Sequence, residues 1–404
     1  MTRYLHYIFS FGIVFLSLLL YTHYFKFILW QETSGPKFLW FFLAFCLFLT
    51  IVLFRRIKGH DFNRTVIVGL LMLLLFSETV KLLQTQQPID TVRISVLMFL
   101  ATMQYFLLKE IRITERQVLW SFTMFGLISF SLQLYQQMPD TIPLFGIINN
   151  DESSIGTVRN DIYKFTIGSY FVSIICLYYW WTELCKKFSL VRCILFCCFL
   201  VSMYLYLVRQ IMAVSLLTLA LSLFLIPDKR ARRLMFVFIV FAGVILIALY
   251  DLIFAALVEN YQNDTWTTDI RFKCIDFVIG QIFDNPIQAL IGHGHDIVER
   301  QWTRMNYYIS DIGFIGECFY YGVAWLVIYF STVFLYVVKY RNKIPLYIRL
   351  YMIGTLMNSI FIFPYRTNEE MFIWICLLYI AHLYVDNKKG VYNKLISEPN
   401  LNFC

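Results

Sequence analysis

The chain has 404 residues, of which 59% are hydrophobic and only 15% are charged, and its mean hydropathy is +0.65. An average soluble domain is about 45–50% apolar and about 25% charged, so this composition excludes an ordinary soluble protein and indicates a polytopic membrane protein. The formal net charge of +8 does not require a nucleic-acid partner, because the basic residues concentrate in short segments between apolar runs.

The apolar runs predict an all-α fold. A membrane-spanning helix needs about 20 mostly apolar residues. The sequence predicts twelve such spans, at 6–25, 38–54, 65–83, 93–108, 118–135, 165–184, 190–207, 210–226, 234–250, 313–338, 346–363 and 370–385. The seventh and eighth share one apolar run, which as a single helix would be nearly twice as long as the hydrocarbon core is thick. We therefore expect it to fold back at Arg209. The first run lacks a small-residue cleavage site and the next follows closely, so we expect a span rather than a cleaved signal.

Charge sets the expected orientation of these spans. If both termini are cytoplasmic, most of the lysines and arginines fall in the short inner loops, as the positive-inside rule requires. Two outer segments are longer, at about 136–164 and at 251–312. The sequence shows no internal repeat and no separate soluble domain, so we treat 1–404 as one membrane domain with a large outer loop.

The stretch "IGHGHD" at 291–296 raises the question of a metal site. His293, His295 and Asp296 are metal-ligand types, but a metal needs a third or fourth ligand, and the two glycines equally indicate a tight turn. The ten cysteines fall mostly inside apolar runs and form no CxxC pair, so neither a disulfide framework nor a structural zinc cluster is predicted. We expect no metal and no cofactor.

An amphipathic helix is predicted at 267–286 in the large outer loop. Its apolar face would consist of Phe272, Ile275, Ile279, Ile282 and Phe283, Thr267 or Thr268 would cap its start, and Pro286 would stop it. We expect this helix to lie at the outer membrane interface, with Arg271 in its first turn.

Three quoted segments resemble a known family in their order and spacing. They are "YLVRQIMAVSLLTLALSLFL", which places an arginine at an outer hairpin, "DIRFKCIDFVIGQIFDNPIQALIGHG", which opens an amphipathic helix with an arginine, and "MNYYISDIGFIGECFYYGV", a polar and glycine-rich entry to a span. Together they resemble the O-antigen polymerase and O-antigen ligase group of polytopic membrane glycosyltransferases, over roughly 190–340.

The resemblance implies roles for several residues. Arg209 and Arg271 would hold the diphosphate of an undecaprenyl-linked sugar donor. The family's ligases have a histidine immediately before the asparagine that corresponds to Asn306, whereas this chain has Met305, which favours the polymerase branch. The resemblance therefore implies an O-antigen or exopolysaccharide polymerase, with ligation of finished polymer to lipid A core as the alternative.

The chemistry of such a transfer fits these residue types. A guanidinium group binds phosphate oxygens bidentately and remains charged when partly desolvated, so it would stabilise the leaving diphosphate. Asp311, His293 or His295 are the candidates for the base that accepts the proton of the acceptor hydroxyl. For each of these residues a structural role is the alternative: Asp311 would cap the next helix, and the two histidines would be ordinary loop residues. Arg209 at a hairpin and Arg271 on a solvated helix could likewise serve only structure.

Three further residues are candidates for substrate contacts, namely Asn306, Tyr307 and Arg159. A solvated loop explains Arg159 equally well, and an interfacial aromatic belt explains Tyr307. The expected partners are an undecaprenyl-diphosphate-linked oligosaccharide, membrane lipid and a chain-length regulator protein, with no nucleic acid. The expected location is the bacterial inner membrane.

A transporter or flippase of a lipid-linked sugar is the alternative from another class of protein. Transporters place polar residues and helix breaks near the middle of the membrane. The predicted spans are almost free of charge at their centres, and both arginines lie at one edge, which favours an enzyme that faces the membrane surface.

Overall fold

In the computed structural model, the described residues are 2–22, 62–84, 88–138, 158–159, 162–163, 170–206, 208–226, 228–229, 231–233, 235–237, 240, 265–294, 309–363 and 368–385. Side chains are described for most of these residues, but not for 2–6, 81–95, 158–159, 162–163 or Arg209, among others.

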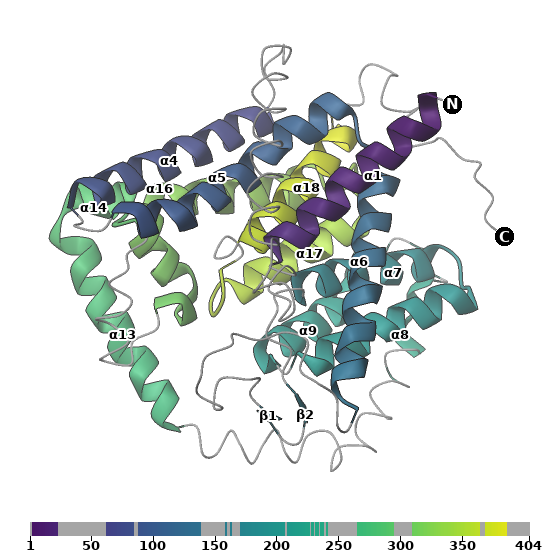
Figure 1. Ribbon diagram of the computed structural model, residues 1–404. Coiled ribbons are helices and arrows are strands. Elements are labelled where there is room, and N and C mark those ends of the chain that lie inside the picture. The colour runs from purple at the N-terminus through teal and green to yellow at the C-terminus, as the bar shows by residue number, and fades with distance from the viewer. Residues whose placement is uncertain are drawn as a thin grey trace.

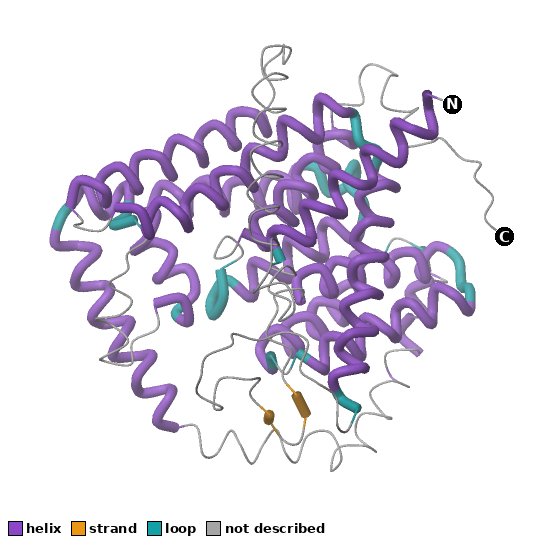
Figure 2. The backbone as a smooth tube through the Cα atoms, viewed as in Figure 1, coloured by secondary structure: helices purple, strands orange, loops and turns teal. Residues whose placement is uncertain are grey.

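The described part of the chain is a bundle of helices (Figures 1 and 2). Its one β-ladder pairs two antiparallel two-residue strands, β1 (Val158–Arg159) and β2 (Ile162–Tyr163). The helices of the first half are α1 (Thr2–Tyr21), α4 (Phe62–Gln84), α5 (Pro88–Ile111), α6 (Glu115–Gln136), α7 (Tyr170–Lys186), α8 (Leu190–Leu205) and α9 (Arg209–Leu225). The remaining elements are α13 (Thr265–Asp284), α14 (Pro286–Ile291), the 3-10 turn η2 (Ile309–Asp311), α16 (Gly313–Phe334), the π-helical turn η3 (Leu335–Lys339), α17 (Leu346–Asn358) and α18 (Asn368–Val385).

Ten of the predicted spans coincide with these helices to within a few residues at most ends. The predicted span at 38–54 and most of that at 234–250 lie outside the described residues. Three described helices are long and apolar enough to cross a membrane, namely Phe62–Val80, Glu115–Gln136 and Gly313–Lys339. Shorter apolar helices occur at Tyr7–Tyr21, Leu190–Leu205 and Gln210–Leu225. These helices are consistent with a membrane protein.

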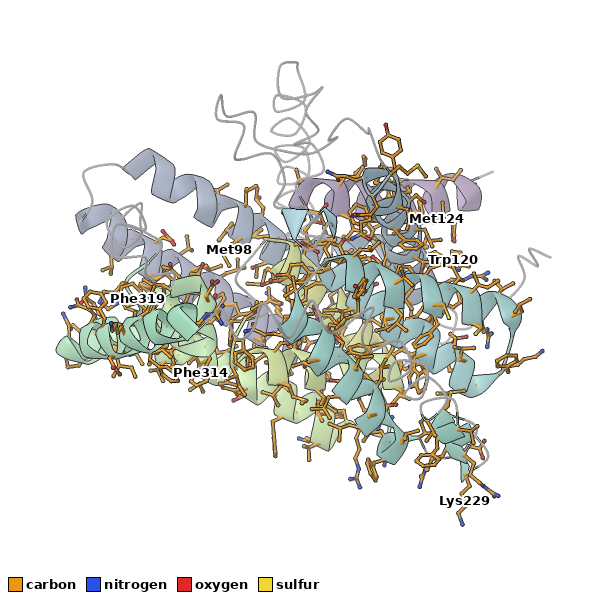
Figure 3. All side chains as sticks on the ribbon, turned by 90° about the horizontal axis from the view of Figure 1, so that it is seen from below. Met98, Trp120, Met124, Lys229, Phe314 and Phe319 are labelled. Atoms are coloured by element: carbon orange, nitrogen blue, oxygen red, sulfur yellow. The ribbon has the colours of Figure 1, made fainter. Side chains whose placement is uncertain are left out.

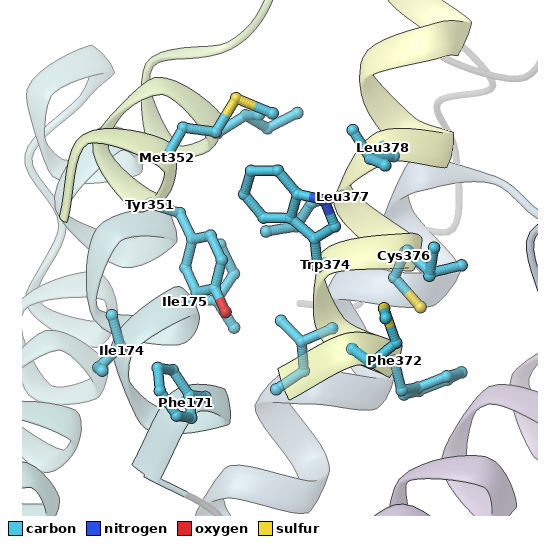
Figure 4. Packing of buried hydrophobic residues seen from close by; sticks show 14 of the residues in the cluster. Phe171, Ile174, Ile175, Tyr351, Met352, Phe372, Trp374, Cys376, Leu377 and Leu378 are labelled. Carbon is cyan, nitrogen blue, oxygen red and sulfur yellow. The ribbon is translucent and has the colours of Figure 1, made fainter. Parts of the chain in front are cut away.

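The core of the bundle surrounds α18. Every residue from Met371 to Leu383 is buried, so this helix is apolar on all sides, as a central helix must be. It packs against α1, α4, α5 and α7. Figure 4 shows Trp374 and Leu377 of α18 facing Tyr351 of α17 and the α7 residues around Ile175. Because lipid is as apolar as leucine, close packing and hydrogen bonds have to hold such helices together in a membrane.

Hydrogen bonds define the two ends of the bundle. At one end, Tyr347 at the start of α17 and Tyr384 at the end of α18 donate to the two carboxyl oxygens of Glu115, at 2.6 and 2.5 Å. Since Glu115 is the first residue of α6, the starts of α6 and α17 and the end of α18 lie together. At the other end, the Tyr170 hydroxyl at the start of α7 donates to Glu370 at the start of α18, at 3.0 Å. Helix directions therefore alternate as the predicted topology requires.

The end that contains Glu115 is also where basic loops gather. Arg112 and Arg116 lie beside Glu115 in the chain, and the α7–α8 turn is close because Tyr179 of α7 contacts Tyr347 with ring centroids 5.5 Å apart. In that turn, Arg192 donates to the carbonyl groups of Glu183 and Lys187 at 2.7 and 3.1 Å. The basic segment 339–349 is there too, because it contains Tyr347, so three of the basic loops that the charge pattern places on one side of the membrane lie at one end of the bundle.

The protein covers only part of the apolar face predicted for this helix. In α13 the buried residues are Cys274, Val278 and Ile282, which are 1%, 0% and 3% exposed, whereas Phe272 and Ile279 are 63% and 38% exposed. Ile282 of the predicted apolar face thus packs on the protein, and the location of Phe272 and Ile279 at a membrane interface stays a prediction. Apolar residues occur on more than one face of this helix, and its contacts with η2 and α16 decide which face is covered.

Pro286 lies beyond the end of α13 and begins the next helix. α13 ends at Asp284, and Pro286 is the first residue of the short helix α14. The side chain of Asn285 caps α14 by accepting a hydrogen bond from the Ile287 N–H at 2.9 Å. A proline is favourable at this position because the N–H that it lacks would have no partner inside the helix.

Candidate functional site

The candidate site lies on what we call the platform, which consists of α13, α14, η2 and α16 up to Gly322. In Figure 1, α13 runs across the direction of α4 and α5 rather than along it, and α14 lies at one end of α4. The platform packs on α4 through α14 and α16. It contains Arg271 and Asp311, and His293 lies in the turn that directly follows α14.

The helix α16 is interrupted at Gly322, where the platform ends and the rest of the helix continues into the bundle. Gly322 has φ 80° and ψ 171°, which interrupts the helical hydrogen-bond pattern. The carbonyl groups of Phe319 and Tyr320, just before the break, accept hydrogen bonds from the backbone N–H groups of His293 and Gly294, at 2.8 and 2.9 Å. A break inside an apolar helix is tolerated when other backbone groups satisfy the freed carbonyls, and the turn after α14 does so here.

Two glycines allow this close crossing of backbones. A Cβ atom on Gly292 would lie 2.2 Å from the Tyr320 carbonyl oxygen, and one on Gly322 would lie 2.2 Å from that of Leu290. Both glycines also have positive φ angles, 84° and 80°, which other residues rarely adopt. Gly292, the first glycine of the "IGHGHD" stretch, therefore allows a backbone crossing with α16.

His293 contributes to the same contact. Its ring stacks on that of Phe319, with centroids 4.3 Å apart and an interplanar angle of 7°, and its Nδ1 lies 3.2 Å from the Phe319 carbonyl oxygen. Figure 3 shows Phe319 and Phe314 projecting from α16 at this end of the molecule. His295 and Asp296 lie outside the described residues. Among the residues that are described, no group of three or more His, Cys, Asp and Glu side chains is arranged to hold a metal ion.

Asp311 does not occupy the N-cap position of α16, which is Ile312. Asp311 is half-buried in η2, which packs against α13. Burial raises the pKa of the Cys274 thiol of α13 to about 11, and the neighbouring carboxylate of Asp311 adds to this increase. Asp311 thus lies beside the buried face of the helix that carries Arg271.

Arg271 is half-buried on α13, nearly one turn before Cys274. Within the described part of the chain, its guanidinium group forms no salt bridge and no hydrogen bond. A half-buried cation without a bonded partner is available to bind an anion.

The predicted fold-back at Arg209 is confirmed, because α8 ends at Leu205 and α9 begins at Arg209. The side chain of Arg209 is not described, so its distance from Arg271 is not defined. Their helices have different neighbours: α9 packs mainly on α17, and α13 packs mainly on α14, η2 and α16. Since α16 contacts α17, these two helices connect the arginine-bearing elements.

The other predicted site residues lie apart from the platform or outside the description. Arg159 belongs to the short strand β1, where only the backbone is described. Asn306 and Tyr307 are outside the described residues.

Sequence reasoning missed three buried acidic residues. Glu317 of α16 is 4% exposed, and Glu369 and Glu370 of α18 are 3% and 0% exposed. The signal was present in the sequence, because a glutamate within or beside an apolar run is costly unless it has a role. The break of α16 at Gly322 was not predicted either.

Comparison with known proteins does not assign a family. No family model matches this chain, and no curated protein matches it.

Proposed function

We propose that this protein is a polytopic membrane glycosyltransferase that polymerises a bacterial surface polysaccharide. In this proposal, twelve spans cross the inner membrane with both termini in the cytoplasm. The enzyme transfers a growing O-antigen or exopolysaccharide chain from undecaprenyl diphosphate to a lipid-linked repeat unit. The gathering of basic loops at the Glu115 end of the bundle supports a cytoplasmic location for that end, because positive loops are retained there.

The observation that carries the proposal is that Arg271 is partly buried without a bonded partner among the described residues. It lies on α13, three residues before the Cys274 that Asp311 approaches. A guanidinium group in this setting suits a diphosphate, which offers several oxygens in the geometry that arginine binds. The sequence segments around Arg209 and Arg271 occur in an order that resembles the O-antigen polymerase group. This resemblance implies that Arg209 is the second cation at the diphosphate.

The reaction would use these groups as follows. The bond between the sugar C1 and the diphosphate oxygen breaks, and a bond forms between C1 and the acceptor hydroxyl oxygen. Arg209 and Arg271 stabilise the negative charge that develops on the diphosphate. Asp311, or one of the histidines His293 and His295, accepts the hydroxyl proton. Asn306, Tyr307 and Arg159 would contact the saccharide, and no metal or cofactor takes part.

Single substitutions test the proposal. Arg271→Ala should abolish chain elongation while the protein level in the membrane is unchanged, and Arg209→Ala should have the same effect. Lys273→Ala is a matched control, because Lys273 is an exposed cation on the same helix, and it should leave chain length unchanged. The readout is the ladder of surface polysaccharide on a gel. Normal ladders from Arg271→Ala would refute its role.

Deletion of the gene separates the enzymatic alternatives. A core capped with single repeats would indicate a lost polymerase. An uncapped core with polymer still on the carrier lipid would indicate an O-antigen ligase, which is the alternative within this enzyme class.

A lipid-linked sugar transporter or flippase is the second candidate. The interruption of α16 at Gly322, with Glu317 and Glu78 buried in the packed helices α16 and α4, favours it, because transporters place broken helices and buried charges at their binding sites. In the deletion strain, loss of precursor from the outer leaflet would identify a transporter.

A further inference from the structure

We propose that the turn between η3 and α17 binds one anionic phospholipid, whose phosphate group lies between Arg341 and Arg349. The proposal rests on the membrane location of the chain and does not depend on the glycosyltransferase function. It follows from a cluster of four cations at the Glu115 end of the bundle and from an apolar stripe that leads to this cluster.

Arg349 is the residue that points most directly to an anion. It is the fourth residue of α17 and is half-buried, and its Nε is buried without a hydrogen-bond partner among the described residues. The guanidinium group of Arg341 lies near enough to repel it. A buried donor without an acceptor is unfavourable, and so are two neighbouring like charges. An anion between the two guanidinium groups would relieve both costs.

The start of α17 adds to the positive potential of this turn. No side chain caps this helix, and its N-cap residue is Pro345, which has no N–H. The N–H groups in the first turn of a helix have no partner inside the helix, and they attract anions. Because side chains in a helix lean toward its N-terminus, the Arg349 side chain extends back toward this start.

Two lysines extend the cluster on the other side of the turn. Lys339 and Lys343 lie over the ring of Tyr340, with their Nζ atoms 5.8 and 5.6 Å from its centroid. These cation–π contacts hold both ammonium groups at the turn. The backbone N–H groups of Lys343 and Ile344 donate to the Tyr340 carbonyl oxygen, at 2.9 and 3.2 Å, so the turn itself has a defined shape.

Within the described part of the chain, no carboxyl group neutralises the four cations Lys339, Arg341, Lys343 and Arg349. The segment 335–358 contains no acidic residue, and none of the four forms a salt bridge with a described residue. Glu115 is at this end of the bundle, but its carboxyl group accepts hydrogen bonds from Tyr347 and Tyr384. The charge of the cluster therefore has to be balanced from elsewhere.

An apolar stripe on α16 and η3 leads to the cluster and suits an acyl chain. Val327, Phe330, Phe334 and Val338 are all exposed. Their spacing of three or four residues places them on one side of the helix, and Val338 directly precedes Lys339. A lipid with an acyl chain along this stripe would bring its phosphate group to the turn. Basic sites between membrane helices bind anionic lipid headgroups in this way. A free phosphate ion would leave the stripe unused, so the observations favour a lipid.

Native mass spectrometry of the purified full-length protein tests the proposal. The protein in detergent is incubated with equal amounts of dioleoyl phosphatidylglycerol, which is anionic, and dioleoyl phosphatidylcholine, which is zwitterionic and has the same acyl chains. The wild-type protein should retain one phosphatidylglycerol molecule in preference. Arg349→Gln and Arg341→Gln should each lower this preference about five-fold, which is the effect of one cation near a membrane phosphate. Because Arg341 is exposed, Arg341→Gln keeps the test decisive if Arg349→Gln fails to fold.

Arg116→Gln is the matched control, because Arg116 is another exposed arginine at the Glu115 end, and it should leave the preference unchanged. A loss equal to that of the two site variants would indicate general attraction to a basic surface and would overturn the proposal. Displacement of the lipid by an equal concentration of inorganic phosphate would indicate a site for free phosphate instead. Equal retention of the two lipids by the wild type would also overturn the proposal, and would indicate that the cluster binds another anion, such as an acidic protein segment.

Discussion

Gly322 lies directly against the Leu290 carbonyl group, so that a Cβ atom at position 322 would be 2.2 Å from the Leu290 oxygen. This contact joins two segments, the end of α14 and the break in α16. Such backbone contacts, together with the His293–Phe319 stack, hold α14 and the turn after it against α16.

Gly322→Ala should destabilise the protein by at least about 2 kcal/mol, because it forces a backbone clash and a positive φ angle on a residue with a side chain. Gly292→Ala should act similarly, since its Cβ would meet the Tyr320 carbonyl oxygen. Thermal unfolding in detergent, followed by circular dichroism, measures the effect. Gly280→Ala on α13 is the control, because a Cβ there meets no atom within 4 Å, and it should be neutral or stabilising. Equal unfolding temperatures for all three variants would contradict the backbone crossing.

Glu115→Ala should also destabilise the bundle, in this case by removing the acceptor of two tyrosine hydroxyls. Tyr347 and Tyr384 both donate to Glu115, and a buried donor left without an acceptor costs about 1–3 kcal/mol. If the geometry is right, Tyr347→Phe in the Glu115→Ala background should restore part of the lost stability. A double-mutant cycle with thermal unfolding measures this coupling. Additive effects would show that the two groups do not interact.

Val278→Ala and Phe272→Ala test which face of α13 is covered. Val278 is fully buried and should lose about 2 kcal/mol of stability on losing two methyl groups. Phe272 is 63% exposed, so its truncation should change the stability by no more than about 0.5 kcal/mol despite the larger side chain. Chemical unfolding of the two purified variants compares them. The reverse order would show that the Phe272 face of α13, rather than the Val278 face, is covered by the protein.

Cys274 should react slowly with thiol reagents and gain reactivity only at high pH. With its pKa raised from 9.0 to about 11, the thiolate fraction near pH 8 falls about 100-fold, and the thiolate is the nucleophile. Peptide mass spectrometry after timed alkylation gives the rate for this cysteine alone. Asp311→Asn should increase the rate, because it removes a neighbouring negative charge, and the unfolded protein should react at the ordinary rate. An unchanged rate in Asp311→Asn would place Asp311 away from Cys274.

The same shift links stability to pH. A thiol whose pKa is higher in the folded than in the unfolded protein stabilises the fold fully below pH 9, and this stabilisation is lost as pH rises through about 11. Cys274→Ser should reduce this alkaline loss of stability, and pH-dependent unfolding curves of the two proteins measure the difference. Parallel curves over that range would contradict the assignment.

The sequence determined the helices and their ends to a large extent. Long apolar runs between basic loops allow few other structures in a membrane, because every backbone group has to be satisfied within its own segment. The length of the apolar run 190–226 predicted a fold-back, since a single helix over these residues would be longer than the hydrocarbon core of the bilayer is thick. The gathering of basic loops at the Glu115 end also agrees with the charge pattern.

Only the tertiary structure decided which residues meet. The sequence pattern placed Phe272 on the apolar face of α13 but did not show which residues the protein covers, and contacts with η2 and α16 bury Val278. A glycine in "YYGV" gave no sign of a break, because the break depends on N–H groups supplied from residues 293 and 294. The meeting of Glu370 with Tyr170 joins positions 200 residues apart, and local periodicity carries no information at that distance.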